Sequence, residues 1–262
     1  VNRMNRPNNQ PLVTTIKERC RVCYTCVREC PAKAIRIADG QAEVLPERCI
    51  GCGNCVRVCS QRAKQVLTGI DRTRELLASD DKVAACIAPS FPAEFSDMEA
   101  ERLVAMVRAL GFDYVNEVAF GADLVAREYR RLLERDDGKR YIATSCPAVI
   151  GFVEKFHSAT VGELAPIVSP MVAAARALHQ LHGPDLKIVF IGPCIAKKGE
   201  AASDKVLDEV DSVLTFIELR QMMEEAGLDL NALESSDFDP PHAARGSLFP
   251  ISRGMLQAAA MH

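Results

Sequence analysis

Tryptophan is absent from this 262-residue sequence, and aromatic residues make up only 5% of it. Long apolar runs are absent as well, because the longest, such as KIVFIG and VAACIA, fall far short of the ~18 residues that a membrane-spanning helix needs. The opening stretch VNRMNRPNNQPLVTT lacks the apolar core of a secretory signal peptide. These absences predict a soluble, cytoplasmic protein with no membrane span.

An excess of charge of one sign is also lacking. The formal net charge is -3, and Lys and Arg residues are scattered among Asp and Glu rather than gathered in a block. This balance argues against nucleic acid as a partner. Hydrophobic residues make up 48% of the chain, which excludes a disordered protein, and the length suits a small module followed by one ordinary domain.

Cysteine, by contrast, is abundant, with eleven residues. In the reducing compartment expected for this chain, such a content indicates metal or redox chemistry rather than disulfides. Eight of the eleven lie in the stretches CRVCYTCVRECP, from residue 20, and CIGCGNCVRVCS, from residue 49, and each cysteine recurs after a shift of 29 positions. Zinc sites usually take their four ligands as two pairs, so a triple-plus-one spacing given twice argues against zinc.

Residues 12–68, which contain both stretches, resemble a bacterial two-cluster ferredoxin. In such proteins three closely spaced cysteines hold one 4Fe-4S cluster and the fourth crosses to the other cluster. That rule assigns two sets of ligands, Cys20, Cys23, Cys26 and Cys59 for one cluster and Cys49, Cys52, Cys55 and Cys30 for the other. Gly51 and Gly53 ease the backbone past the cluster, and KAIRIADGQAEVLPERC predicts a hairpin that turns at Asp39-Gly40. The resemblance implies electron transfer.

The chain changes character after a charged connector, residues 69–81, that has a short helical pattern. Four segments are predicted as buried strands, namely VAACIAP, YVNEVAF, YIATSCP and KIVFIGPC. Four others are predicted as helices, namely EAERLVAMVRALG, DLVAREYRRLLERDD with a cap near Asp123, SPMVAAARALHQLHG and IELRQMMEEAG. Because strands alternate with helices, residues 82–262 are expected to form an α/β domain with a largely parallel sheet.

Three cysteines belong to this second part. Ligands in α/β sheets bind at the carboxyl ends of the strands. Cys146 ends YIATSCP and Cys194 ends KIVFIGPC, so both are predicted to be ligands at that edge. Cys86 lies inside VAACIAP and is interpreted as a small apolar core residue.

Two segments in this second part carry a further resemblance. TSCPAVIGFVEKF and GPCIAKKGE resemble the first two signature motifs of the iron-only hydrogenases, and FGADLVAREY and VSPM fit the family pattern between them. In that family an H-cluster, a 4Fe-4S cubane bridged by a cysteine thiolate to a di-iron unit with CO and cyanide, reduces protons or oxidises hydrogen. The resemblance implies these roles: Cys146 and Cys194 as two of four cubane thiolates, Lys197 and Ser169 as contacts of cyanide, and Glu200 beside the active site.

Several positions depart from the catalytic pattern. The first motif of catalytic members has two adjacent cysteines, and the earlier one is the last proton relay, a catalytic position that Ser145 occupies here. A serine hydroxyl exchanges protons poorly. Two relay glutamates fall on Tyr129 and Leu132, and Gly192 replaces a methionine. The combination resembles a divergent branch of the family, thought to be sensory, in which turnover is slow.

The family's third motif, with two more cubane cysteines, does not occur in the sequence. We therefore expect an α+β ferredoxin-like module with two 4Fe-4S clusters, followed by an incomplete α/β hydrogenase active-site domain of a C-terminally truncated chain. An H-cluster is expected only in a complete chain, with a redox partner such as ferredoxin and a downstream signalling domain. Two alternatives stay open: an electron-transfer protein whose second domain holds no di-iron cofactor, and an iron-sulfur maturation factor.

Overall fold

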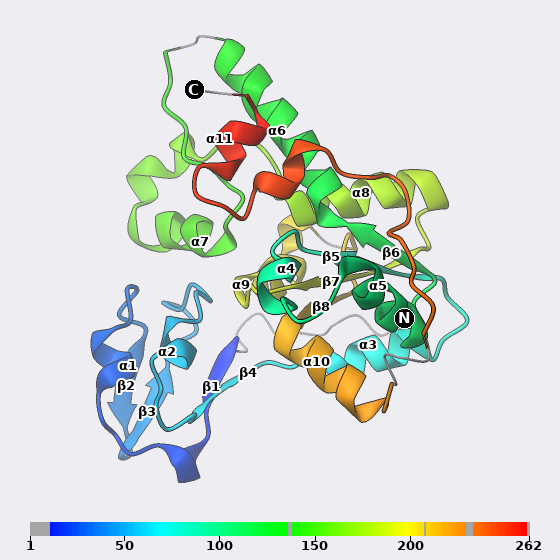
Figure 1. The fold of residues 1–262 in the computed structure, drawn as a ribbon. Coiled ribbons are helices and arrows are strands. Elements are labelled where there is room, and N and C mark those ends of the chain that lie inside the picture. Colours follow the sequence, from blue (N-terminus) through cyan, green and yellow to red (C-terminus); the bar gives the residue numbers. More distant parts are fainter. Residues whose placement is uncertain (1–10, 136–137, 207, 229–232, 261–262) are drawn as a thin grey trace.

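The computed structural model describes residues 11–135, 138–206, 208–228 and 233–260. A small ferredoxin-like module, blue to cyan in Figure 1, lies beside a larger α/β domain. Within these described ranges no helix is both long enough and apolar enough to cross a membrane.

The ferredoxin-like module is built from two copies of one unit, each with a cysteine-bearing loop, a one-turn helix and a strand. Helices α1 (Thr25–Arg28) and α2 (Asn54–Arg57) are related by the same 29-residue shift as the cysteines, as are the starts of β2 (Ile35–Ala38) and β4 (Lys64–Val66). Two antiparallel pairs hold the module together, β4 with β1 (Val13–Thr15) and β2 with β3 (Gln41–Val44). A 3-10 turn, η1 (Lys17–Arg19), follows β1.

The predicted hairpin turn is confirmed. Asp39 and Gly40 join β2 to β3, and both have positive φ, +48° and +70°. Positive φ at both central residues is what a two-residue hairpin turn requires, because its twist then matches that of the strands.

The larger domain is organised around a four-stranded parallel sheet in the order β6-β5-β7-β8. Its strands are β5 (Val83–Ile87), β6 (Tyr114–Glu117), β7 (Lys187–Gly192) and β8 (Ser212–Thr215). Every residue of β5 is buried, as expected for an inner strand of a sheet that is covered on both faces. The predicted α/β class with a parallel sheet is thus confirmed.

Helices cover both faces of this sheet, with α5 and α10 on one side and α6 and α8 on the other (Figure 1). The α-helices of the larger domain are α3 (Ile70–Leu77), α4 (Phe91–Glu94), α5 (Ala100–Ala109), α6 (Val118–Glu134), α7 (Pro147–Phe156), α8 (Pro170–His182), α9 (Ala196–Ala201), α10 (Phe216–Glu225) and α11 (Gly254–Ala258). Three 3-10 helices complete it, η2 (Ser158–Glu163), η3 (Asp204–Val206) and η4 (Arg245–Leu248).

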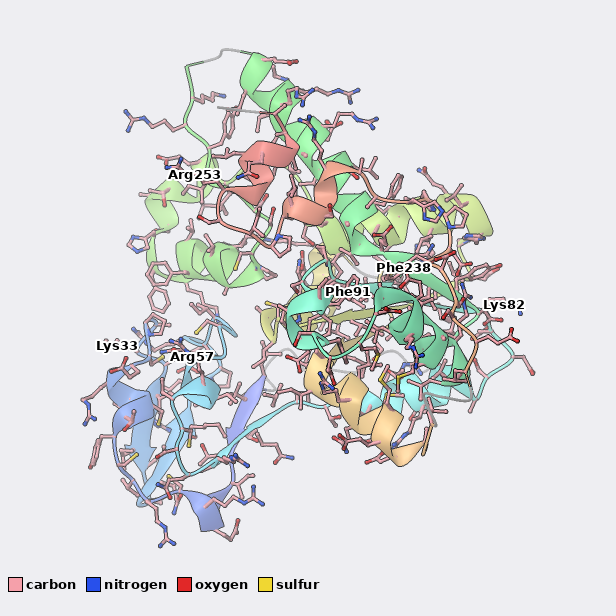
Figure 2. All side chains as sticks on the ribbon, viewed as in Figure 1. Lys33, Arg57, Lys82, Phe91, Phe238 and Arg253 are labelled. Carbon is pink, nitrogen blue, oxygen red and sulfur yellow. The ribbon has the colours of Figure 1, made fainter. Side chains whose placement is uncertain are left out.

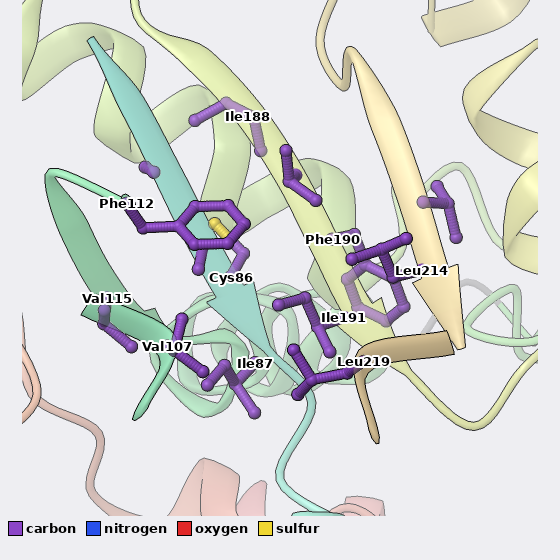
Figure 3. Close-up of a cluster of buried hydrophobic side chains, with 14 of the residues drawn as sticks. Cys86, Ile87, Val107, Phe112, Val115, Ile188, Phe190, Ile191, Leu214 and Leu219 are labelled. Carbon is purple, nitrogen blue, oxygen red and sulfur yellow. The ribbon is translucent and has the colours of Figure 1, made fainter. Parts of the chain in front are cut away.

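The main core lies between the sheet and the helices. In Figure 3 Val107 of α5 and Leu219 of α10 approach the face of the sheet that presents Ile87 and Ile191. Cys86 belongs to this core, and burial raises the pKa of its thiol to about 12. It therefore packs as a small apolar side chain, as its sequence context predicts.

The prediction that YIATSCP forms a strand of the sheet is wrong. Residue 142 makes only an isolated parallel bridge with Leu164. The backbone of Ile142 bonds instead to Glu163 and Ala165, at 2.7 and 2.9 Å, so its hydrogen-bonding groups are satisfied by a neighbouring loop. Cys146 consequently follows a loop and not a sheet strand.

Two other features differ from the predictions. α6 begins at Val118, five residues before Asp123, whose carboxylate accepts the backbone N–H groups of Ala244 and Gly246. The last two residues of that predicted helix, 136–137, lie outside the described residues. The second difference is β8, which was not predicted.

The connector contains the short helix that its pattern predicts. This is the eight-residue helix α3, which packs against β8 through a 2.9 Å hydrogen bond between Thr73 and Ser212.

Candidate metal centres

Two small cavities in the ferredoxin-like module are each lined by four cysteines. The first quartet is Cys20, Cys23, Cys26 and Cys59, and the second quartet is Cys30, Cys49, Cys52 and Cys55. Each quartet takes three thiols from one copy of the repeat and the fourth from the other copy. The structure therefore brings together the two sets that the crossed spacing predicts, while their ligation of clusters stays a prediction.

The donors of these quartets fit iron-sulfur clusters. The backbone N–H of Ala34 donates to Cys30 Sγ at 3.2 Å, and that of Ala63 donates to Cys59 Sγ at 3.3 Å, at equivalent positions of the two copies. Hydrogen bonds to sulfur are among the features that tune such clusters.

The loop of the second quartet lies directly against the larger domain. A Cβ on Gly51, whose φ is +70°, would lie 3.2 Å from Ala196 Cα, and a Cβ on Gly53 would lie 2.9 Å from Ile195 Cδ1. Lys155 of α7 donates to the carbonyl of Cys49 at 2.7 Å. In Figure 1 α7 and α9 face the small module accordingly. The second quartet is therefore next to the segments that carry Cys146 and Cys194.

Cys146 and Cys194 each precede a helix. Cys146 is the exposed N-cap residue of α7, and Cys194 is partly buried between β7 and α9. Burial raises the pKa of the Cys194 thiol, the backbone N–H groups of Lys197 and Ala196 oppose that rise, and a negative charge on Cys146 adds to it. The segments that carry the two thiols meet through Lys197, which contacts the carbonyl of Ser145 next to Cys146.

Lys197 joins the two cysteine-bearing segments. Its ammonium is buried, lies 2.6 Å from the Glu200 carboxylate and donates to the backbone carbonyl of Ser145 at 3.5 Å. From the sequence alone, Lys197 and Glu200 could also have been solvated residues at the start of a helix. Both side chains are little exposed, which excludes that alternative. The predicted Lys197, Glu200 and Ser145 therefore meet in one place, beside Cys146.

Two hydroxyls at this place lack partners. Among the described residues, five buried side-chain N or O atoms have no hydrogen-bond partner, and Ser145 Oγ and Ser169 Oγ are two of them. Ser169 is only 1% exposed and occupies the N-cap position of α8, but its side chain makes no capping hydrogen bond. A buried unpaired hydroxyl costs about 1–3 kcal/mol, so these donors fit a bound group with hydrogen-bond acceptors. The residues fit the polar surroundings of the predicted H-cluster, although this sequence supplies two of its four cubane thiolates.

A cavity of 570 Å³ opens between the ferredoxin-like module and the larger domain. Its lining includes Cys49 and Ile50 of the second quartet's loop, Ile150 of α7, Ser169 and Glu200. Cys146 and Cys194 do not line it, so the two thiols lie to one side of this space. The cavity thus extends from the loop of the second quartet to Glu200 and to Ser169, one of the two predicted cyanide contacts.

Known families match both parts of the chain. Residues 12–60 match the 4Fe-4S dicluster domain. Residues 81–262 match the C-terminal domain of the iron-only hydrogenase large subunit. The chain belongs to the iron-only hydrogenase family.

Relatives of this hydrogenase-family chain fall into two groups. Iron hydrogenase 1 of Clostridium pasteurianum is 28% identical over 217 residues, 72% of this chain and 38% of that protein. The cytosolic Fe-S cluster assembly factor NAR1 of Yarrowia lipolytica is 22% identical over 215 residues, 72% of this chain and 44% of that protein. A structure of a variant of the FeFe-hydrogenase HydA1 from Chlamydomonas reinhardtii has a TM-score of 0.61 and 25% identity, and covers 74% of this chain and 57% of that one. The chain thus spans less than half of these two curated relatives.

The departures from the catalytic pattern of the iron-only hydrogenases have local physical reasons. The hydroxyl of Tyr129 accepts the backbone N–H of Thr144 at 2.8 Å, so this side chain holds the residue before Ser145. Leu132, on the same helix, is buried among apolar neighbours. A Cβ on Gly192 would lie 2.8 Å from the ring of Phe190, so a methionine does not fit there without a shift of that ring.

The sequence analysis of this hydrogenase-family chain missed a buried ion pair beside the site. Lys198 lies 2.8 Å from the Glu218 carboxylate and donates to the carbonyl of Val213 at 2.6 Å. Glu218 also accepts the backbone N–H of Gly69 at 2.8 Å and forms a capping box with Thr215. Only the capping box, T-x-x-E, was a readable signal, because twenty residues separate the two charges.

Proposed function

We propose that this chain passes electrons through two 4Fe-4S clusters to an H-cluster-type site that reduces protons or oxidises hydrogen slowly, in a sensory role. The observation that carries the proposal is the position of Lys197, whose buried ammonium contacts Ser145 and Glu200 where the two cysteine-bearing segments meet. An ammonium in a buried place binds anionic acceptors strongly. Membership of the iron-only hydrogenase family supports the same assignment.

The described residues would take these roles in the following way. The first quartet includes the exposed Cys23 and would accept electrons from a redox partner such as ferredoxin, and the second quartet would pass them to the larger domain. Cys146 and Cys194 would hold the cubane, and Lys197 and Ser169 would donate hydrogen bonds to its di-iron unit. When bound, the H-cluster would supply the redox chemistry of hydrogen. A downstream signalling domain in the complete protein would receive the output.

Slow turnover is proposed because protons lack a continuous path. General acid-base groups typically contribute ~10²- to 10⁴-fold to a rate. Here Ser145 Oγ has no hydrogen-bond partner among the described residues, the Tyr129 hydroxyl is bonded to Thr144, and Leu132 cannot carry a proton. These three positions interrupt the relay that catalytic members of the family have.

Anaerobic reconstitution with iron and sulfide tests the cluster assignment. The chain should bind about eight irons, and Cys30→Ala should damage the cluster held by Cys49, Cys52 and Cys55 rather than the one held by its sequence neighbours. Electron paramagnetic resonance distinguishes the two clusters, and Cys86→Ala is the matched control. Bound zinc, or four irons with all eight cysteines intact, would contradict the assignment.

Hydrogen evolution from a reduced artificial donor tests the slow turnover, on the complete protein matured with a synthetic di-iron precursor. The unaltered protein should be far slower than catalytic relatives. Ser145→Cys alone should recover little, and Ser145→Cys combined with Glu at positions 129 and 132 should recover more. Rates that match catalytic relatives without any substitution would remove the physical basis of the sensory role.

A second candidate function is iron-sulfur cluster assembly without a di-iron unit. The similarity to cluster assembly factors and the loss of the relay cysteine at Ser145 favour it. Infrared spectroscopy after maturation separates the candidates, because only the hydrogenase-type site should show vibrations of metal-bound CO and cyanide.

A further inference from the structure

Lys64 interrupts the internal repeat of the ferredoxin-like module. The 29-residue shift aligns it with Ile35, and each residue opens its strand, β4 in the second copy and β2 in the first. Both positions are buried, with 8% exposure for Lys64 and 6% for Ile35. An apolar core position in one copy is therefore a charged core position in the other. Such a break in a pattern marks a functional or strained site.

The ammonium of Lys64 has no counter-ion among the described residues. Its Nζ donates to Thr15 Oγ1 at 2.6 Å and to the carbonyl of Ala42 at 3.3 Å, and both acceptors are neutral. A buried charge without an opposite charge is costly. The compensating negative charge must therefore come from something else that lies close to Lys64.

The first cysteine quartet is a negative group at this place. Lys64 lines the cavity of that quartet together with Ala42, whose carbonyl accepts a hydrogen bond from its ammonium. Lys64 is not part of the lining of the second quartet's cavity. The ammonium thus lies beside the first quartet.

We infer that Lys64 is a counter-charge of the 4Fe-4S cluster of the first quartet and raises its reduction potential. The inference rests on the proposed assignment of two clusters to the quartets. Reduction adds one electron to a cluster and makes it more negative, so a nearby positive charge stabilises the reduced form. Lys64 acts as a positioning charge and exchanges neither electrons nor protons. The first cluster becomes a better acceptor, which favours the flow of electrons away from the hydrogen site.

Coulomb's law sets the size of the effect. With an effective permittivity of ~20 and a separation of ~10 Å, removal of one charge should weaken the reduction equilibrium of the first cluster roughly tenfold. For a one-electron couple, a tenfold change corresponds to ~59 mV. The midpoint potential of the first cluster should therefore fall by about this amount in a variant that lacks the charge.

Redox titration of the reconstituted chain, followed by electron paramagnetic resonance, tests the inference with Lys64→Met and with Lys64→Ile, which copies the first repeat. The matched control is Lys33→Met, because Lys33 is an exposed lysine of the same module (Figure 2) and its loss changes the net charge equally. We expect the potential of the first cluster to fall in the Lys64 variants and that of the second cluster to change less. The control should shift far less, because water and salt screen an exposed charge.

The outcomes separate this inference from the proposed function. Absence of two clusters in the unaltered chain would refute the proposed function. Eight irons with an unchanged potential of the first cluster in Lys64→Met, or an equal fall of both potentials, would refute the inference and leave the proposed function intact. If Lys64→Met fails to hold clusters, the variant Lys64→Arg decides, because it keeps the charge. Bound clusters with unaltered potentials in Lys64→Arg would support a role of the charge. Loss of the clusters in Lys64→Arg would show that Lys64 acts by packing alone.

Discussion

The buried pair of Lys198 and Glu218 allows a quantitative prediction for Glu218→Gln. The side chains are only 4% and 12% exposed, and the carboxylate also accepts N–H groups of Gly69 and Thr215. Loss of one partner leaves a buried ammonium with uncharged oxygens. Such changes typically cost 3–5 kcal/mol, and since glutamine keeps one acceptor we expect about 3 kcal/mol.

The matched control is Glu225→Gln, which breaks the ion pair between α10 and Arg74. Those side chains are 45% and 49% exposed, so the expected loss is far smaller than for Glu218→Gln. Hydrogen exchange of peptides that cover β8 and α10 is the appropriate assay, because it reports the larger domain without requiring both parts of the chain to unfold together.

The difference in stability between Glu218→Gln and the unaltered protein should depend on pH. Burial raises the pKa of Glu218. The charge of Lys198 and the hydrogen bonds lower the pKa by more than burial raises it, so the net pKa is below the ordinary 4.5. The stabilisation is fully present above the ordinary pKa and is lost as the pH falls through the lower folded pKa. The difference in stability between the unaltered protein and Glu218→Gln should stay constant between pH 7 and about 5, and it should become smaller at lower pH. Equal protection from hydrogen exchange in Glu218→Gln and in the unaltered protein at pH 7 would refute the reasoning.

Three further predictions follow from local geometry. Gly51→Ala should lower iron content and stability more than Gly40→Ala, because both have φ +70° but only a Cβ on Gly51 meets neighbouring atoms; equal losses in iron assays would show that backbone strain alone matters. Cys86→Ala should leave iron content unchanged and cost about 1 kcal/mol of stability in urea unfolding, since the thiol only packs in the core. Ser145→Cys should raise hydrogen evolution of the complete, matured protein little while Leu132 still blocks the route, and full recovery by this change alone would contradict the relay argument.

The internal repeat explains why so much of the small module could be predicted. A constant shift of 29 positions fixes which cysteines are equivalent, and the crossed quartets follow from that symmetry. The turn at Asp39-Gly40 depends on two adjacent residues and was equally accessible. Lys64 was readable in the same alignment, as a lysine opposite Ile35, but its burial and its neutral partners became visible only in the fold.

The larger domain was less accessible for a physical reason. An apolar run such as YIATSC has the same pattern whether it joins a sheet or packs as a buried loop, and the hydrogen bonds that decide between them come from distant residues, here Glu163 and Ala165. The contact of Lys197 with Ser145 and the pair of Lys198 with Glu218 likewise join segments far apart in the chain. Motif residues could be assigned from resemblance, whereas their mutual positions required the structure.

The close contact of Gly51 and Gly53 with residues 195–196 has a kinetic consequence. Electron carriers on mobile domains often transfer charge only when the domains meet, so their rates depend on viscosity. Here the loop of the second quartet already lies against the segment after Cys194. If the quartets carry electrons as proposed, no hinge motion would have to precede the transfer, and its rate would be limited by driving force and tunnelling distance, not by conformational gating.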